Sequence, residues 1–246
     1  MASDLLVIVP SRGRPESVAR VVAAWQATGA YERADLLFAV DADDPLLAEY
    51  HAQDLPADGR TLVKLFAVNR WMPMVHKLNL LARQAAASPD PYFALGFAGD
   101  DHLPRTTGWA ASTTAALREM GTGIVYGNDL LQGERLCTAW AMTSDIVRAL
   151  GRMVPAPVEH MYCDNSVMDL GRQAGCLRYL PRVVIEHCHP LAGKAEWDVG
   201  YARVNRAEQF HRDEAAYRRW AGPDRDADVA AVKALRGSGG AVRNPE

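Results

Sequence analysis

The sequence predicts an α/β fold in which a mostly parallel central sheet is flanked by helices. Short apolar runs alternate with amphipathic segments along the first hundred residues, which is typical of parallel strands joined by helical crossovers. The run at residues 92–98 is largely apolar, as expected of a strand buried on both faces. It leads into Gly99, Asp100 and Asp101, at the sheet edge where ligands bind in open α/β folds.

The first half of the chain supplies regular alternation. Strands are expected at residues 5–10, 35–40, 61–68 and 92–98, and helices at 15–29, 46–51 and 74–87. Pro15 suits the first turn of its helix, where a helix leaves backbone amides unpaired. Val18, Val21, Val22 and Trp25 then recur at helical spacing and define the face that this helix should bury.

The second half is less regular. Helices are expected at residues 106–120, 143–150, 162–174 and 201–220, and strands at 123–126, 136–142 and 177–186. Thr143 or Ser144 is expected to cap the second of these helices. The charges of the last helix are most simply a solvated face.

Composition sets the broad class of the protein. The chain has 246 residues, of which 49% are hydrophobic and 23% charged, as in an ordinary globular protein. A formal net charge of −3 excludes a global basic field that would recruit nucleic acid. The four cysteines lack the spacing of a zinc site, so reduced thiols are expected. Without a signal peptide or an apolar run of membrane-spanning length, the expected location is cytoplasmic.

The adjacent carboxylates of Asp100 and Asp101 are the first candidate functional group. Two ionised carboxylates repel each other, and a Mg²⁺ or Mn²⁺ ion that also holds a diphosphate would remove that conflict. The alternative is a solvated turn that leads into a helix, because aspartate is common in turns.

The loop at residues 11–14, Ser-Arg-Gly-Arg, is the second candidate. It is neither a GxGxxG nor a P-loop sequence, which disfavours the common dinucleotide and NTP sites. A helix N-terminus beside Arg12 and Arg14 nevertheless suits a phosphate or a nucleotide base. The alternative is two surface arginines on a tight turn.

The order of these motifs resembles that of the GT-A fold glycosyltransferases, especially the family-2-like group. The segments that carry the resemblance are VIVPSRGRP at 7–15, FAVDADDP at 38–45, HKLNLLARQA at 76–85, GFAGDDHLP at 96–104 and CDNSVMDLG at 163–171. It extends over residues 5–190. The resemblance implies a GT-A (Rossmann-like) fold with a smaller acceptor-side region, and a metal-dependent transfer of sugar from a nucleotide sugar to an acceptor hydroxyl. Residues 1–104 would bind the donor, 105–220 would form the acceptor and catalytic half of the same domain, and 221–246 a partly disordered tail.

The resemblance also implies roles for individual residues. The donor-binding set is Pro10, Ser11, Arg12, Arg14, Asp41, Lys77, Asn79, Asp100 and Lys194. Asp101 and His187 are the expected ligands of Mn²⁺ or Mg²⁺, with His189 as the second choice. His102 stands where the family more often has an acid, so its part in metal binding stays open.

The favoured catalytic and acceptor-binding residues lie in the second half of the chain. Asp164 would be the base of an inverting reaction, although Cys163 replaces the usual preceding acid. The alternative for Asp164 is an acid favoured by a helix N-terminus. Four tryptophans are candidates for an acceptor platform, because indole rings stack on sugars and bases: Trp71, Trp109, Trp140 and Trp197. Trp140 and Trp197 are favoured because both lie near the implied acceptor side. The alternative is that these rings belong to the core.

Partners and competing functions stay open at this level. A UDP-sugar is favoured over a GDP-sugar, and the acceptor hydroxyl would belong to a small molecule, a glycan or modified DNA. The competing functions are a sugar nucleotidyltransferase and a non-catalytic nucleotide- or sugar-binding module, for which Asp164 would be dispensable.

Overall fold

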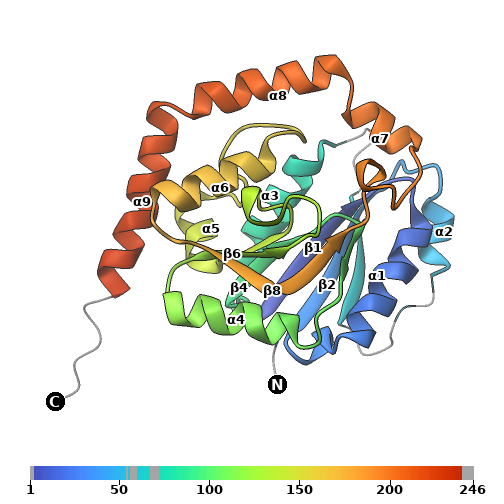
Figure 1. The fold of residues 1–246 in the computed structure, drawn as a ribbon, viewed down its shortest axis with the longest axis horizontal. Coiled ribbons are helices and arrows are strands. Elements are labelled where there is room, and N and C mark those ends of the chain that lie inside the picture. Colours follow the sequence, from blue (N-terminus) through green and yellow to red (C-terminus); the bar gives the residue numbers. More distant parts are fainter. Residues whose placement is uncertain (1–2, 54, 56–59, 67–71, 240–246) are drawn as a thin grey trace.

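The computed structural model describes residues 3–53, 55, 60–66 and 72–239. Its centre is an eight-stranded sheet with the strand order β3-β2-β1-β4-β7-β6-β8-β5 (Figure 1). The strands are β1 (Leu5–Ser11), β2 (Ala34–Asp41), β3 (Thr61–Phe66), β4 (Ala94–Phe97), β5 (His102–Pro104), β6 (Ile124–Asn128), β7 (Trp140–Thr143) and β8 (Leu177–His187). The predicted mostly parallel α/β sheet is confirmed, with β7 antiparallel to β4 and β6, and β5 antiparallel to β8.

Helices cover both faces of the sheet. They are α1 (Pro15–Ala27), α2 (Leu47–His51), α3 (Met74–Ala86), α4 (Trp109–Met120), α5 (Ser144–Leu150), α6 (Cys163–Gln173), α7 (Val199–Val204), α8 (Ala207–Trp220) and α9 (Pro223–Gly239). One apolar core joins α3, α5, α6, α8 and α9 to the sheet, and the other joins α1, α2 and α4. The alternation of side chains along β1 supplies both cores, because Ile8 faces the first and Val7 the second.

The C-terminal part departs from the simplest expectation. The single helix expected at residues 201–220 is divided into α7 and α8, and α9 lies within the stretch assigned to the tail. These three helices arch over the top and the left side of the molecule in Figure 1. Val232 of α9 and Trp220 of α8 are buried in the first core, so this region packs against the domain.

The polar residue Asp213 of α8 is buried for a structural reason. Its carboxylate accepts hydrogen bonds from the backbone amides of Glu159, His160 and Met161 at 2.8–3.0 Å. These amides belong to the loop that leads into α6. The helix that the sequence presented as a charged surface therefore also fixes the entrance to α6.

The strand pair β6–β8 contains an irregularity next to the site. Gly127 pairs with Leu180, whereas the following Asn128 pairs with Val184, so β8 has extra residues at this point. A Cβ at Gly127 would lie 2.5 Å from the carbonyl oxygen of Val183, which only glycine avoids. Within the described ranges, no helix is long and apolar enough to cross a membrane.

Candidate active site

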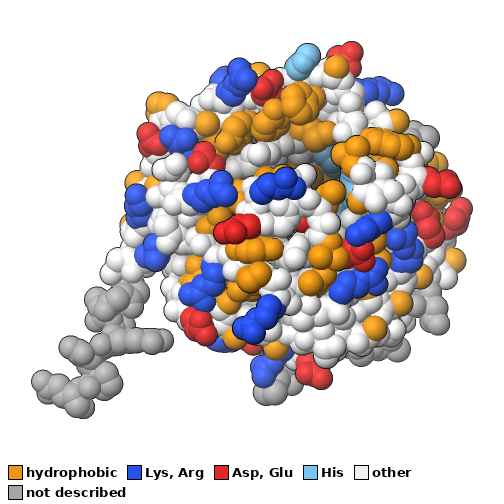
Figure 2. Space-filling view, viewed as in Figure 1, with side chains coloured by type: hydrophobic (Ala, Val, Ile, Leu, Met, Phe, Trp, Pro, Cys, Tyr) orange, Lys and Arg blue, Asp and Glu red, His pale blue; other side chains and the backbone are white. Residues whose placement is uncertain are grey.

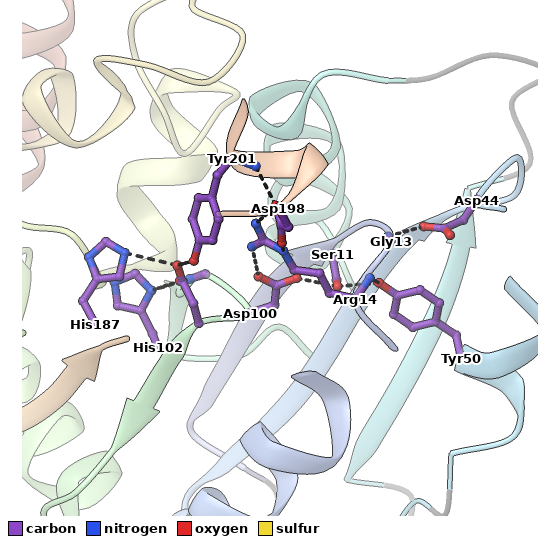
Figure 3. Close-up of polar contacts among 12 residues, drawn as sticks. Ser11, Gly13, Arg14, Asp44, Tyr50, Asp100, His102, His187, Asp198 and Tyr201 are labelled. Carbon is purple, nitrogen blue, oxygen red and sulfur yellow. Dashed lines mark hydrogen bonds and ion pairs between the residues drawn. The ribbon is translucent and has the colours of Figure 1, made fainter. Parts of the chain in front are cut away.

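The candidate site lies at the carboxyl ends of the parallel strands. β1 ends at Ser11, β2 ends at Asp41, and Asp100 follows β4 after a short turn. Because these strands are parallel neighbours, their ends meet at one edge of the sheet. The later strand β8 brings His187 to the same region (Figure 3).

An aspartate and two histidines form a cluster within this edge. β5 begins at His102, and its pairing with β8 sets His102 opposite His187. The two imidazole rings consequently stack with their centroids 4.0 Å apart. Asp101 lies against both rings, since its Oδ1 is 3.0 Å from His102 Nδ1 and its Oδ2 is 3.3 Å from His187 Nε2. The structure thus brings the two predicted metal ligands, Asp101 and His187, together and adds His102.

This cluster fits a divalent cation. One ligand atom from each of the three residues lies within 4.8 Å of the others. His102 Nε2 and His187 Nδ1 are buried without a hydrogen-bond partner among the described residues. Although burial alone would raise the pKa of Asp101, hydrogen bonds from the two histidines hold it well below its usual range. An ionised carboxylate with two imidazoles is a donor set that suits Mn²⁺ better than Ca²⁺.

A tyrosine closes the cluster from the C-terminal side. Tyr201 of α7 donates its hydroxyl to Asp101 Oδ2 at 2.6 Å. The guanidinium of Arg14 lies over the Tyr201 ring, with Arg14 Cζ 3.9 Å from the ring centroid. α7 is therefore linked to both the Asp-His-His cluster and the first loop (Figure 3).

Arg14 connects the first loop to two further carboxylates. Its Nη1 is 3.1 Å from Asp100 Oδ1, and its Nε and Nη2 bind Asp198 bidentately at 2.6 and 2.8 Å. Ser11 also donates to Asp100, at 2.6 Å. Burial raises the pKa of Asp100 to about 6, and the neighbouring Asp101 adds to that rise. Arg14 is thus the main cation that stabilises the charged form of Asp100.

The loop at residues 11–14 is held from the side of α2. Gly13, at φ 69°, donates its amide to Asp44 at 2.8 Å. The amide of Arg14 donates to the hydroxyl of Tyr50 at 3.0 Å, and that hydroxyl lies 2.7 Å from Ser11 Oγ. Glycine is needed because a side chain at this φ is strained. These contacts fix the conformation of the loop, and its nucleotide-binding role stays a prediction.

Asp41 forms a second charged centre at the end of β2. Its carboxylate is fully buried, and Oδ2 accepts from Arg12 at 3.0 Å and from Lys77 at 2.9 Å. Oδ1 has no hydrogen-bond partner within the described part of the chain. A buried carboxylate oxygen of this kind requires a donor from a ligand or from water.

Asp164 is the second residue of α6 and lies close enough to the Asp-His-His cluster to interact with its charges. Burial raises its pKa to about 7, whereas the thiol of Cys163, 3.3 Å from Oδ1, and the nearby His187 moderate the rise. Asp129 and Asp101 raise it further. A carboxyl group with a pKa near neutrality can accept a proton from a substrate hydroxyl.

Three predicted site residues have other contacts. Asn79 uses both ends of its amide on the backbone of Met153 and Val154, which anchors that loop to α3. Lys194 forms an exposed ion pair with Glu186, 2.6 Å away. Trp140 is packed in the core against Phe97, with ring centroids 4.4 Å apart.

The remaining predicted site residues are Trp197, Pro10 and Trp71. Trp197 is exposed and lies edge-on to His189 and Tyr201, with centroids 6.2 and 5.9 Å apart. Pro10 precedes Ser11 at the end of β1. Trp71 lies outside the described residues.

Sequence reasoning did not assign roles to Tyr201, Asp198 or Asp129. Asp129 accepts three backbone amides and the hydroxyl of Thr138, and its carbonyl accepts from the amide of His187. It therefore fixes the turn beside His187. The Gly-Asn-Asp sequence at 127–129 marks such a turn. No local pattern indicates that Tyr201 reaches Asp101, which lies 100 residues away in the sequence.

The fold is that of the GT-A class, and comparison with known proteins supports this. No protein-family model and no curated protein matches the sequence. Among solved structures, the chain is similar to the mannosyltransferase PcManGT from Pyrobaculum calidifontis, solved with GDP-Man and Mn²⁺. The TM-score is 0.59 at 12% identity, over 100% of this chain and 77% of that one.

Two further structures have similar folds. For S. aureus TarS 1–349, solved with UDP-GlcNAc, the TM-score is 0.53 at 9% identity, over 82% of this chain and 64% of that one. For a mycobacterial protein the TM-score is 0.50 at 14% identity, over 81% of this chain and 69% of that one. At these identities the likeness concerns the fold, and it confirms the predicted GT-A fold.

Proposed function

We propose that the protein is a metal-dependent glycosyltransferase that moves a sugar from a nucleotide-diphosphate sugar to an acceptor hydroxyl. The observation that carries this proposal is the Asp101-His102-His187 cluster at the carboxyl edge of a GT-A sheet, beside Arg14. The donor and Mn²⁺ named for PcManGT, and the UDP-GlcNAc named for TarS, support the same chemistry.

The donor would lie between the first loop and α3. The free Oδ1 of Asp41 is the expected acceptor for an N–H of the base, and Arg12 and Lys77 hold the carboxylate in place from the other side. Uracil presents one such N–H at N3, and guanine presents N1–H and an amino group. One free oxygen supports a UDP-sugar as the expected donor and a GDP-sugar as the alternative.

The diphosphate would lie near Arg14 and Asp101. A divalent cation held by Asp101, His102 and His187 would offset the negative charge on the departing diphosphate. Arg14 would bind a phosphate oxygen with the Nε–Nη2 edge of its guanidinium, which now binds Asp198. Ser11 would keep Asp100 in position through their 2.6 Å hydrogen bond.

Asp164 is the proposed general base if the reaction inverts the anomeric carbon. With a pKa of about 7 it is half ionised near neutrality, so it can take a proton from the acceptor hydroxyl. The cysteine that precedes it does not carry charge at this pH, because burial raises the pKa of the Cys163 thiol well above its usual value.

Calorimetric titration tests the proposal. UDP and GDP are titrated into the protein with and without Mn²⁺, and one of them should bind only with the metal. Asp101→Ala should abolish that binding, whereas Asp35→Asn, at the amino end of β2, should leave it unchanged. Binding of neither nucleotide under any condition would reject the proposal.

The competing functions have their own signatures. A sugar nucleotidyltransferase would release pyrophosphate from a nucleoside triphosphate and a sugar phosphate, and a coupled pyrophosphate assay detects that product. A non-catalytic binding module would keep its ligand affinity in Asp164→Asn and show no sugar transfer in the wild type. Sugar transfer that is lost in Asp164→Asn, with nucleotide binding intact, would exclude both.

A further inference from the structure

Four large apolar side chains stand out as exposed in the described part of the chain. They are Leu130, Leu191, Trp197 and Phe210, with exposed fractions of 50, 75, 56 and 42%. Single exposed apolar residues are normal on a protein surface, so their number is unremarkable. Their distribution is informative, because each belongs to a segment that joins the candidate site. We call these four residues the apolar rim.

The contacts of each residue place it beside the site. Leu130 follows Asp129, whose carboxylate lies 3.9 Å from His187 Nδ1. The amide of Leu191 donates to His189 Nδ1 at 3.1 Å, and the His189 ring lies 5.0 Å from that of His187.

The other two members are connected in the same way. Trp197 packs near Tyr201, whose hydroxyl binds Asp101. Phe210 of α8 lies 5.3 Å from the ring of Tyr162, two residues before Asp164. All four residues of the apolar rim thus belong to segments that contact the Asp-His-His cluster or lie next to the proposed base.

Figure 2 shows a hollow on one face of the molecule. Apolar side chains border a hollow on two sides, and a histidine is visible within the hollow. Charged side chains are spread over the rest of this face. A polar, metal-binding centre within an apolar border is complementary to a molecule with one polar and one apolar end.

Leu130 provides an independent argument. Its φ is 58°, in the left-handed region that leucine rarely adopts, and half of its side chain is exposed. The turn is fixed without it, since the Leu130 amide donates to Asn128 Oδ1 and Asp129 binds the next three amides. Neither strain nor exposure of an apolar group helps the chain to fold. Asparagine or glycine would suit the backbone better, so a leucine here is best explained by contact with a ligand.

We infer that the apolar rim binds the apolar part of an amphiphilic acceptor, whose polar head enters the site next to Asp164. This inference rests on the proposed function and specifies its acceptor class as a lipid-linked or alkyl-bearing molecule. The rim consists of four separate exposed side chains. It is therefore less suited to a protein partner, which needs about 800 Å² of continuous surface on each side.

Alkyl glucosides of increasing chain length are the probes for the test. Hexyl, octyl and decyl β-D-glucopyranoside, each below its micelle concentration, are titrated into the full chain, with glucose as the reference without an alkyl group. Affinity should rise with each methylene, by up to about fourfold where the group is fully buried. Equal affinity for glucose and for all three glucosides would overturn the inference.

Two variants locate the binding. Leu130→Asn and Leu191→Ser should each flatten the dependence on chain length. Both should leave the affinity for nucleotide and Mn²⁺ unchanged. Leu130→Asn should also equal or exceed the wild type in resistance to urea, because asparagine tolerates a positive φ. A chain-length dependence that survives in both variants would contradict the inference.

Two further outcomes separate this inference from its alternatives. If neither nucleotide binds but the glucosides bind through the rim, the proposed function fails and the rim is still an amphiphile site. If vesicles of anionic phospholipid sediment the protein in a rim-dependent way, and monomeric glucosides do not bind, the rim docks on a membrane and the inference is overturned.

Discussion

Replacing Asp164 by asparagine should stabilise the folded protein at high pH while it removes catalysis. Asp164 is half-buried near the start of α6, and the desolvation of its carboxyl group raises the pKa from 3.8 to about 7. Since the folded protein holds this proton more tightly than the unfolded chain, the stability it contributes is complete below pH 3.8. That stability is lost as the pH rises towards 7. Asparagine has a similar shape and does not ionise.

The magnitude follows from the pKa difference. At 1.36 kcal/mol per pH unit, a rise from 3.8 to about 7 corresponds to about 4 kcal/mol of lost stability at pH 8. Part of this loss has already occurred at pH 5. Between pH 5 and pH 8 the wild type should therefore lose about 2.5 kcal/mol more than Asp164→Asn.

Urea denaturation at the two pH values measures this difference directly. Wild type and Asp164→Asn are unfolded at pH 5 and pH 8 with EDTA present, so that no cation lowers the pKa of the carboxyl group. Contributions from groups far from Asp164 are shared by the two proteins and cancel in the comparison, so the difference reports Asp164 together with the charges that interact with it. Free energies of unfolding that change in parallel, within about 0.5 kcal/mol, would refute the account of Asp164 as a desolvated, readily protonated carboxyl group.

Three other perturbations have defined outcomes. His102→Ala should weaken Mn²⁺ binding at least about tenfold, measured by calorimetry, because it removes one of two imidazoles from the cluster; unchanged affinity would assign the metal to Asp101 and His187 alone. Asp41→Asn should weaken nucleotide binding by about tenfold or more, since it replaces a buried acceptor by an amide; an equal loss for pyrophosphate would contradict contact with the base. Gly127→Ala should destabilise the protein by about 2 kcal/mol in urea denaturation, because its Cβ would meet the Val183 carbonyl; an unchanged unfolding midpoint would show that β8 shifts freely.

Local pattern was sufficient for most of the fold. The Rossmann-like first half followed from apolar runs and helix boundaries such as Pro15, because these depend on nearest neighbours in the sequence. The antiparallel placement of β7 and the pairing of β5 with β8 did not follow, since strand partners depend on contacts far apart in the chain. α9 was not anticipated either, because the burial that stabilises it is provided by α5 and α6.

In the candidate site, too, residues next to predicted strands could be found from the sequence, whereas residues placed by distant contacts could not. Asp41, Asp100 and Asp101 were recognisable because they follow apolar strands directly. The contact between His102 and His187 could not be predicted without the register of β5 on β8. The contact between Tyr201 and Asp101 could not be predicted without the position of α7. Trp140 and Asn79 illustrate the converse, because an aromatic ring or an amide can serve the core or a loop as well as a ligand.

The bidentate pair between Arg14 and Asp198 affects how donor binding responds to salt. An anionic donor that binds Arg14 exchanges one carboxylate for one phosphate, so the number of counterions around the guanidinium hardly changes. Donor affinity should therefore depend only weakly on ionic strength. The same exchange frees Asp198, the N-cap of α7, and so couples occupancy of the site to the position of Tyr201.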